Sequence, residues 1–339
     1  DKVNEEAMKL AKQTVEAKNF PWPNAANIKY PLITTSAIQF ASRAMPELIP
    51  DEKIVNAKVV GQDPDGAKEA RAERVTQYMD YQLTTEIDDW EEGMDRMLHV
   101  LPIIGTCFKK TFYDSLLGQV CSVFLTPDDV VVHAKALNLK TARQVSHRFY
   151  KYENYYLEMK AAGHWREIEL GQAVSDTGED DPPHLFIEQH RWLDLDDDGY
   201  EEPYIVTVHK ETAEVLRIIA RYDAESLQLK NGRLIRIEPD QYFVKYPFVP
   251  NPDGGFYDIG FGTLLYPINK SINAVINQLL DAGTLATAGG GFLSRGVRLK
   301  AGSVKFTPGE WKPTDVMGQD LRSGILPLPV REPSQVLFS

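Results

Sequence analysis

The chain has 339 residues, of which 43% are hydrophobic and 25% are charged, and its formal net charge is −12. These proportions are typical of a packed globular protein, and the length allows two domains or one large domain with insertions. The acidic excess argues against broad attraction to a polyanion, because a protein that neutralises phosphates usually carries a basic surface. We expect neither a signal peptide nor a membrane span, since no apolar run reaches the roughly 18 residues that a span needs.

The first hundred residues carry the apolar spacing of helices. Helices are expected over 1–18, 31–45 and 68–101. Pro31 suits the first turn of the second helix, where its missing N–H costs little. We divide the third segment into 68–86 and 89–101, because Asp88, with Glu91 three residues later, forms an N-terminal capping box.

Short strands dominate the chain from residue 103 to residue 250. The segments expected as strands are 103–113, 119–126, 142–150 and, from His184 onward, HLFIEQHRWL, EPYIVTVHK, EVLRIIARY, RLIRIEP and QYFVKYPF. The first two strands form a hairpin, and a short helix ends at Gly163. Turns such as Asn231-Gly232 join the later strands.

A long helix is expected over 262–283, and a segment of short strands punctuated by glycine and proline continues to Pro333. Helices, a mixed sheet layer, one long helix and a small β-rich piece thus follow one another without regular β-α alternation. This order predicts an α+β fold.

The two cysteines, Cys107 and Cys121, lie on the two strands of the predicted hairpin. A turn centred near Leu116 would place Cys107 opposite Leu125. The same register would place Cys121 opposite Thr111. The two sulfur atoms would then not face each other, so we expect free thiols, as in a reducing compartment.

Known catalytic motifs are missing from the sequence. GQDPDGAK (61–68) imitates a phosphate-binding loop, but Ala67 separates its second glycine from the lysine. No GxSxG, HExxH or strand-linked GxGxxG motif is present. His184 and His190 share one predicted strand, but no cysteine pair accompanies them for zinc. His99 is interpreted as a core histidine. The sequence therefore predicts a protein that is not an enzyme.

An acidic stretch, DLDDDGYEEP (194–203), has the spacing of half a calcium-binding loop. Gly199 takes the sharp-turn position, but Ile205 stands where an EF-hand requires a bidentate glutamate. A hairpin turn with an acidic half-loop remains, and Glu201 is an alternative to Glu202 as an extra ligand. The candidate ligands for a structural Ca²⁺ or Mg²⁺ ion are Asp194, Asp196, Asp198, Tyr200 and Glu202. Two interpretations stay open, a bound cation and a charged turn screened by water; no cofactor is required.

Four segments in chain order resemble the portal proteins of tailed bacteriophages, in the branch found in short-tailed phages. WEEGMDRMLHVLPIIGTCFKKTFYD (90–114) looks like the helix that leads into a hairpin in that family. LTPDDVVVHAKALNLKTARQVSHRFY (125–150) resembles the segment that follows. GFYDIGFGTLLYPINKSINAVINQLLDAG (255–283) is similar to the stem helix and its glycine-rich approach, and LPLPVREPSQVLF to the start of the returning stem helix.

The resemblance implies a division of the chain into the parts of a portal protomer. These are a wing over 1–261, a stem helix over 262–286, a clip over 287–333 and the start of the returning stem helix over 334–339. The family places a second stem helix, a tunnel loop and a crown after the clip, so we expect this sequence to stop before them.

The resemblance also implies a function. The chain would form a structural ring, usually a dodecamer, at one vertex of the capsid, through which the genome is packaged and ejected. Its partners would be further copies of the chain, the terminase motor, a head-completion adaptor, scaffolding and major capsid proteins, and weakly held double-stranded DNA. Its location would be the virion, and the host cytoplasm during assembly. The acids alone suggest a different class, a calcium-dependent hydrolase or a carbohydrate-binding β-rich domain.

Two stripes run along the helix predicted over 262–283. The apolar stripe comprises Leu265, Ile268, Ile272, Val275, Ile276 and Leu279. The polar stripe comprises Asn269, Asn273 and Asn277, which recur every four residues. Asparagine is a poor helix former, so this spacing favours a shaped interface or a channel-lining face. The alternative is a plain amphipathic helix on a globular core.

The candidate clip reverses the charge of the chain locally. The basic residues of 292–312 are Arg295, Arg298, Lys300, Lys305 and Lys312, and the one acid there is Glu310. Two interpretations stay open, a contact surface for the motor, the adaptor or passing DNA, and a solvated basic strand.

Overall fold

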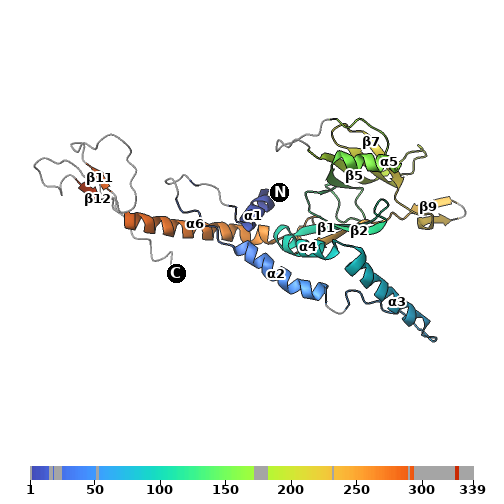
Figure 1. Cartoon of the computed structure of the whole chain (residues 1–339), viewed down its shortest axis with the longest axis horizontal. Helices are drawn as coiled ribbons and strands as arrows, with labels where there is room; N and C mark the ends of the chain where they lie inside the picture. Colours follow the sequence, from blue (N-terminus) through green and yellow to red (C-terminus); the bar gives the residue numbers. More distant parts are fainter. Residues whose placement is uncertain are drawn as a thin grey trace, which may run out of the picture. The chain divides into compact units, whose positions relative to one another are not determined.

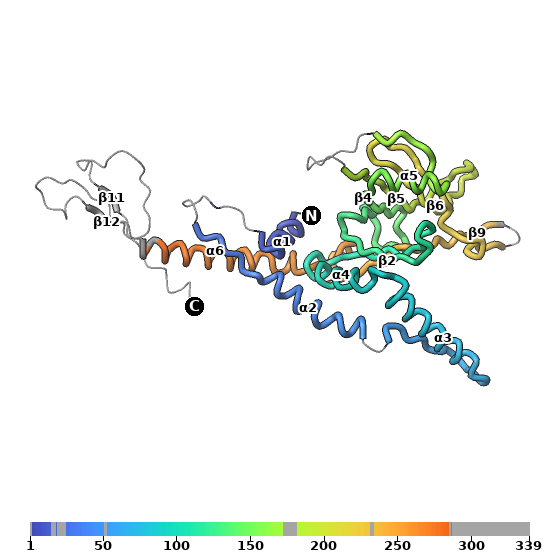
Figure 2. The backbone as a smooth tube through the Cα atoms, viewed as in Figure 1, coloured from blue at the N-terminus to red at the C-terminus, as the bar shows by residue number. Residues whose placement is uncertain are grey.

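Figure 1 shows the computed structural model of the chain, and Figure 2 follows its backbone as a tube. The structure describes residues 2–14, 18, 25–50, 53–171, 182–230, 233–288, 291–293 and 325–327. These residues form helices and antiparallel sheets in separate groups, which confirms the predicted α+β class. None of the helices in these ranges combines the length and apolar character that a membrane span requires.

The described residues form α-helices close to most of the predicted positions, but the helix predicted over 1–18 ends at Ala11, where a turn follows with Gln13 at a positive φ of 55°. The α-helices are α1 (Lys2–Ala11), α2 (Leu32–Leu48), α3 (Ala67–Tyr81), α4 (Trp90–Ile104), α5 (Glu153–Ala161) and α6 (Phe261–Ala288). The helix predicted over 68–86 is divided, because a π-helical turn, Gln82–Glu86, follows α3. In that turn the Thr84 hydroxyl donates a hydrogen bond to the Asp80 carbonyl oxygen at 2.7 Å, a local bond that competes with regular helix geometry.

Two predictions about α4 are wrong. Asp89, and not Asp88, is its N-cap residue, and the Asp89 side chain makes no capping hydrogen bond. The His99 side chain is 43% exposed, so His99 is not a core residue. It lies outside the buried side of the helix, which consists of Met94, Met97, Leu98, Leu101, Pro102 and Ile103.

The strands pair in antiparallel sheets. They are β1 (Thr106–Asp114), β2 (Gln119–Leu125), β3 (Val130–Val132), β4 (Gln144–Lys151), β5 (His184–Leu193), β6 (Glu202–His209), β7 (Val215–Ala220), β8 (Leu227–Lys230), β9 (Arg233–Ile237), β10 (Phe243–Pro247), β11 (Gly291–Leu293) and β12 (Ile325–Pro327). A 3-10 turn, Ala224–Ser226, precedes β8. The sheet orders are β10-β1-β2, β3-β4-β5-β6-β7, β8-β9 and β11-β12.

The β1–β2 hairpin has a register one residue away from the predicted one. Phe108 lies opposite Leu125, and Cys121 lies opposite Phe112, whereas Cys107 pairs with Tyr246 of β10. The reason is a four-residue turn. Its Gly118 has a positive φ of 69° and donates its N–H to the Asp114 carbonyl oxygen at 2.8 Å. Both cysteines are free thiols, as predicted, and burial raises the pKa of Cys107 to about 12.

Two of the apolar clusters among the described residues lie at the larger sheets. One lies between β1, β3, β4 and β10 and includes Phe108, Val130, Val145 and Phe243. The other holds α5 against the five-stranded sheet, where Figure 1 shows α5 beside β5 and β7. Its buried members are Tyr156, Met159, Trp165, Phe186 and Leu216. A third cluster packs α4 on β1 through Met97, Leu101 and Cys107.

The chain divides into two compact units. Unit 1 combines residues 1–35 with residues 265–339, and unit 2 consists of residues 36–264. The predicted boundary after residue 261 thus lies close to the end of unit 2. Residues 1–35, however, group with the long helix and not with the predicted wing, because the backbone of 26–30 is hydrogen-bonded to α6.

Candidate functional site

The start of α6 is fixed by a contact between two backbones in unit 2. A Cβ atom on Gly105 would lie 2.4 Å from the Asp258 carbonyl oxygen, and one on Gly260 would lie 2.4 Å from the Ile103 carbonyl oxygen. Only glycine allows this approach at either position. The Asp258 N–H also donates a hydrogen bond to the Thr106 hydroxyl oxygen at 2.7 Å. The glycine-rich stretch before α6 therefore packs on the end of α4 and sets where α6 begins.

The polar stripe of α6 holds an extended segment, residues 26–30, which we call the strap. Asn277 makes a double contact with it: its Oδ1 accepts the Ile28 N–H at 2.7 Å and its Nδ2 donates to the Ile28 carbonyl oxygen at 3.1 Å. At Tyr30 the same two bonds come from two side chains. Asn273 Oδ1 accepts the N–H at 2.7 Å, and Asn269 Nδ2 donates to the carbonyl oxygen at 3.0 Å.

The strap runs antiparallel to the helix, and the spacings of the two backbones match. Four helical residues rise about 6 Å, and two residues of an extended chain rise about 6.6 Å. Every fourth side chain of α6 therefore meets every second residue of the strap. In an extended chain the N–H and C=O of one residue point the same way, so each amide side chain can serve both, as a neighbouring strand would.

The prediction that the asparagines line a channel is wrong for this chain. Asn269 is 1% exposed, and Asn273 and Asn277 are 8% exposed, so their side chains are covered by the strap and by their own unit. The stripe is a shaped interface, but the interface lies within the chain. Asp281, which the sequence analysis missed, continues it: its Oδ1 accepts the Ala26 N–H at 2.7 Å. The spacing of four residues from 269 to 281 is the signal that identifies Asp281.

The apolar stripe of the same helix is not covered in this way. All six members lie in the described part of α6, and none belongs to the buried core; Ile268 is 52% exposed and the other five are half-buried. The helix thus differs from an ordinary amphipathic helix, because its three asparagines are buried, whereas Ile268 is exposed and the other five apolar residues are only partly buried.

A hollow of about 340 Å³ lies beside the stripes in unit 1. It is lined by Glu6, Lys9, Leu10, Thr14, Lys29, Tyr266, Lys270 and Asn273. The Tyr266 hydroxyl donates a hydrogen bond to the Glu6 carboxylate, and the Lys270 ammonium lies 5.6 Å from the centroid of the Tyr266 ring. The bond between Tyr266 and Glu6 attaches α1 to α6, and α1 is further held by the Thr34 hydroxyl, which donates to the Ala11 carbonyl oxygen.

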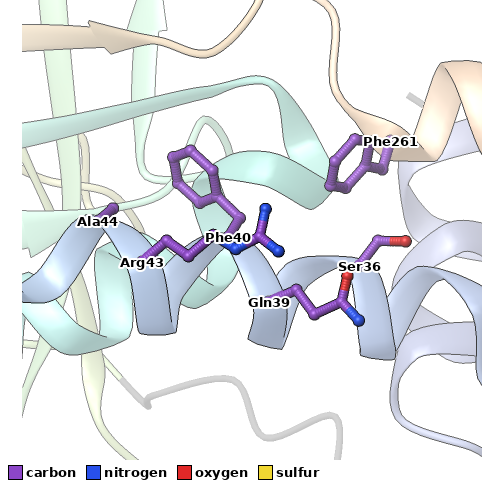
Figure 3. A pocket seen from close by; sticks show the side chains of 6 residues that line it. All are labelled: Ser36, Gln39, Phe40, Arg43, Ala44 and Phe261. Atoms are coloured by element: carbon purple, nitrogen blue, oxygen red, sulfur yellow. The ribbon is translucent and has the colours of Figure 1, made fainter.

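A second hollow, of about 450 Å³, lies in unit 2 between α2 and the first residue of α6 (Figure 3). It is lined by Ser36, Gln39, Phe40, Arg43, Ala44 and Phe261. Phe248 packs edge-on against Phe40 and Phe261, with ring centroids 5.1 and 5.0 Å apart. None of the lining side chains is a carboxylate, histidine or thiol, so this hollow offers an apolar surface with one guanidinium and no acid-base pair.

The buried charges of unit 2 form a separate cluster. The Lys110 ammonium lies 2.7 Å from one Glu188 carboxylate oxygen and 2.8 Å from the other. His190 Nε2 lies 2.7 Å from the same carboxylate. Burial raises the pKa of Glu188, but the hydrogen bond with His190 and the charge of Lys110 outweigh burial and hold the pKa well below its usual range. The cluster joins β1 of the three-stranded sheet to β5 of the five-stranded sheet and so holds the two sheets together.

The acidic stretch connects β5 to β6 as an exposed turn. Ligand atoms of Asp194, Asp196 and Asp198 lie within 4.8 Å of one another, as the half-loop spacing predicts, and Glu202 is outside this group. The carboxylates already accept bonds from the turn itself: Asp194 Oδ2 from the Gly199 N–H, and Asp198 Oδ1 from the Tyr200 N–H. Glu201 is paired with Arg143. A Ca²⁺ or Mg²⁺ ion at this turn stays a prediction.

The candidate clip is described only by β11 and β12, which pair antiparallel with Phe292 opposite Leu326. The basic residues predicted as clip contacts, Arg295, Arg298, Lys300, Lys305 and Lys312, lie outside the described residues. The predicted start of the returning stem helix, 334–339, lies outside them as well.

Comparison with known proteins does not assign the chain. No family model matches the sequence, and no curated protein matches it.

Proposed function

We propose that this chain is the protomer of a bacteriophage portal ring, in which neighbouring copies pack along the apolar stripe of α6. The observation that carries the proposal is the contrast between the two stripes of α6: its asparagines are buried by the strap, while Ile268 is exposed and the other apolar residues of the stripe are only partly buried. Covering the exposed half of Ile268 contributes about 1 kcal/mol, and each of the other five residues, which are less exposed, contributes less. Burial of the six side chains of the stripe would therefore favour association between copies of the chain.

The form of the association follows from the position of the stripe. A helix of 28 residues is about 42 Å long, and the stripe follows one side of it. Identical chains that join through two different surfaces form a closed ring when the rotation between them closes, and a filament when it does not. A closed ring of stem helices is the arrangement that the resemblance to portal proteins implies.

The charge of the chain suits a conduit better than a DNA-binding protein. With 49 acids against 37 bases, the protomer lacks the excess of cations that tight phosphate binding requires. DNA would pass through the ring weakly held. The terminase motor and the head-completion adaptor would dock on the clip, with scaffolding and capsid proteins around the ring at the capsid vertex. The role is structural, and catalysis would belong to the motor.

The test is a pair of charge-matched variants of the full-length protein. Ile268→Asp with Ile272→Asp places two carboxylates on the apolar stripe. Ala274→Asp with Gln278→Asp places two carboxylates with the same i,i+4 spacing on exposed positions of the same helix. Sedimentation velocity and negative-stain images should show rings for the wild type and the second variant, and monomers for the first. Circular dichroism should show that all three keep their helix content.

Two results would contradict the proposal. Rings that persist in Ile268→Asp with Ile272→Asp would show that the stripe is not the assembly surface. If the wild-type protein stays monomeric at every concentration, the proposal that the chain forms a ring is wrong.

A further inference from the structure

Two histidines and one glutamate, side chains of the types that bind metals, lie together at one end of the five-stranded sheet. His209 is the last residue of β6, and His184 is the first residue of β5. Glu211 belongs to the turn between β6 and β7. Since Phe186 pairs with His209, the antiparallel register brings His184 level with Glu211. The sheet itself therefore brings the three residues together.

Their ligand atoms are close. His209 Nε2 lies 3.2 Å from His184 Nδ1 and 2.9 Å from a Glu211 carboxylate oxygen, and all three atoms lie within 4.8 Å of one another. In a tetrahedral zinc site, metal–ligand bonds of about 2.0–2.1 Å place ligand atoms about 3.3 Å apart. The observed separations are close to that value.

Hydrogen bonds alone do not account for both close contacts of His209 Nε2, with His184 and with Glu211. His209 Nε2 has one direction in the ring plane, which carries either one hydrogen or one lone pair, yet it faces both a nitrogen and a carboxylate. If it carries the hydrogen and donates to Glu211, no second hydrogen serves the contact with His184. If it accepts from His184, its lone pair faces the carboxylate of Glu211. One cation placed among the three atoms satisfies both contacts.

The surroundings are those of a built site. His209 is 0% exposed, and its other nitrogen, Nδ1, lies 2.9 Å from the Thr212 hydroxyl. Metal-bound histidines usually hold a partner at the second nitrogen, which fixes the ring and leaves the first nitrogen for the metal. The Glu211 side chain is 19% exposed, so solvent can reach the carboxylate side. Phe186, 5.4 Å from the His209 ring between centroids, forms an apolar wall.

We infer that His184, His209 and Glu211 bind one divalent transition-metal ion, of which Zn²⁺ is the best match. Two imidazoles and one carboxylate are ligands that zinc favours, whereas Ca²⁺ and Mg²⁺ favour sets made of oxygen atoms. Three protein ligands leave a fourth position for water. The ion would fasten the β6–β7 turn to the beginning of β5. This site is independent of the proposed assembly along α6.

The experiment measures metal-dependent stability in the full-length protein, after treatment with a chelator and its removal. Adding Zn²⁺ at a hundredfold excess over the dissociation constant should raise the Tm by about 5 °C or more. One Zn²⁺ should be bound per chain. Replacing Zn²⁺ by Co²⁺ should produce the visible absorption of a four-coordinate site, without the thiolate charge-transfer band that cysteine ligands would add.

Two variants decide whether this group is responsible. Glu211→Gln removes the charged ligand but keeps the shape of the side chain, and it should abolish the Tm gain and the Co²⁺ absorption. Glu214→Gln changes an exposed glutamate of the same turn and should bind metal as the wild type does. Circular dichroism checks that both fold. A wild type with no Zn²⁺-dependent change would overturn the inference, and so would a Glu211→Gln variant that keeps the full Tm gain.

Discussion

Asn277 binds Ile28 through both polar atoms of the Ile28 backbone, at 2.7 Å to the N–H and 3.1 Å to the carbonyl oxygen. A helix thus acts toward an extended segment as a strand would, with a side-chain amide in place of a peptide group. The chain needs this contact because a strap that lies along a helix has no neighbouring strand with which to form its backbone hydrogen bonds. Asn269, Asn273 and Asp281 repeat the arrangement along α6.

Replacing Asn277 by alanine should therefore release the strap. Two partly buried hydrogen bonds are lost, each of which contributes about 0.5–1.5 kcal/mol; the better helix propensity of alanine returns at most about 0.7 kcal/mol. The backbone amide of Ile28 should exchange its hydrogen with solvent about tenfold faster or more. Gln278→Ala, at the exposed neighbouring position, is the control. Equal exchange rates at Ile28 in both variants would show that the amide does not hold the strap.

The contact between Gly105 and Gly260 predicts a large effect of one added methyl group. In Gly260→Ala the new Cβ would lie 2.4 Å from the Ile103 carbonyl oxygen, and backbone cannot rotate away as a side chain can. The free energy of unfolding should fall by about 1–3 kcal/mol or more. In Gly283→Ala, within α6, no atom lies within 4 Å of the added Cβ, so stability should stay the same or rise by up to about 1 kcal/mol. Urea denaturation measures both, and a Gly260→Ala variant as stable as the wild type would refute the close approach.

His147 predicts how stability depends on pH. Burial, together with the nearby charge of Lys110, lowers its pKa from an ordinary value near 6.5 to about 4. Between these values the unfolded chain binds a proton that the folded chain does not, so protonation favours unfolding. Stability should be complete above pH 6.5 and should fall as the pH decreases, with His147 contributing a loss of about 2 kcal/mol between pH 7 and pH 5.

The variant His147→Phe, which keeps an aromatic ring beside Phe149 and Phe243, should flatten the stability curve in that interval. Part of the dependence of stability on pH should remain in this variant, because burial also lowers the pKa of His190. Urea denaturation at pH 7, 6 and 5 compares the two proteins. Parallel curves for wild type and variant would show that His147 does not carry the proton uptake.

Several features of the fold could be predicted because they depend on neighbouring residues. The helices α2 and α6 and most strands of the five-stranded sheet follow their apolar periods, and the turn with Gly199 at a φ of 87° follows from its composition. The errors lie where one local signal competes with another. The β1–β2 register moved by one residue because Asp114 and Gly118 close a turn of four residues.

In the candidate sites, too, local features could be predicted from the sequence, whereas contacts between distant residues could not. The spacing of Asn269, Asn273 and Asn277 correctly marked one face of α6 as an interface, but nothing local identified its partner, which is about 240 residues away in the chain. Likewise, the sequence predicts no zinc site at His184, because no cysteine pair accompanies His184 and His190 on their strand. The neighbours of His184 come from the end of β6 and the turn after it, and only the register of β5 with β6 brings them into reach.

The sequence by itself determined the fold class, the positions of most helices and strands, the free thiols and the two stripes of α6, because periodicity, turn residues and helix propensity act over a few residues. The tertiary structure alone decided that the strap covers the asparagine stripe, that β10 pairs with β1, and that two histidines and a glutamate converge. Such pairings depend on the sum of many weak contacts between distant segments, set against the entropy of closing long loops. These pairings therefore cannot be predicted from any short stretch of the sequence.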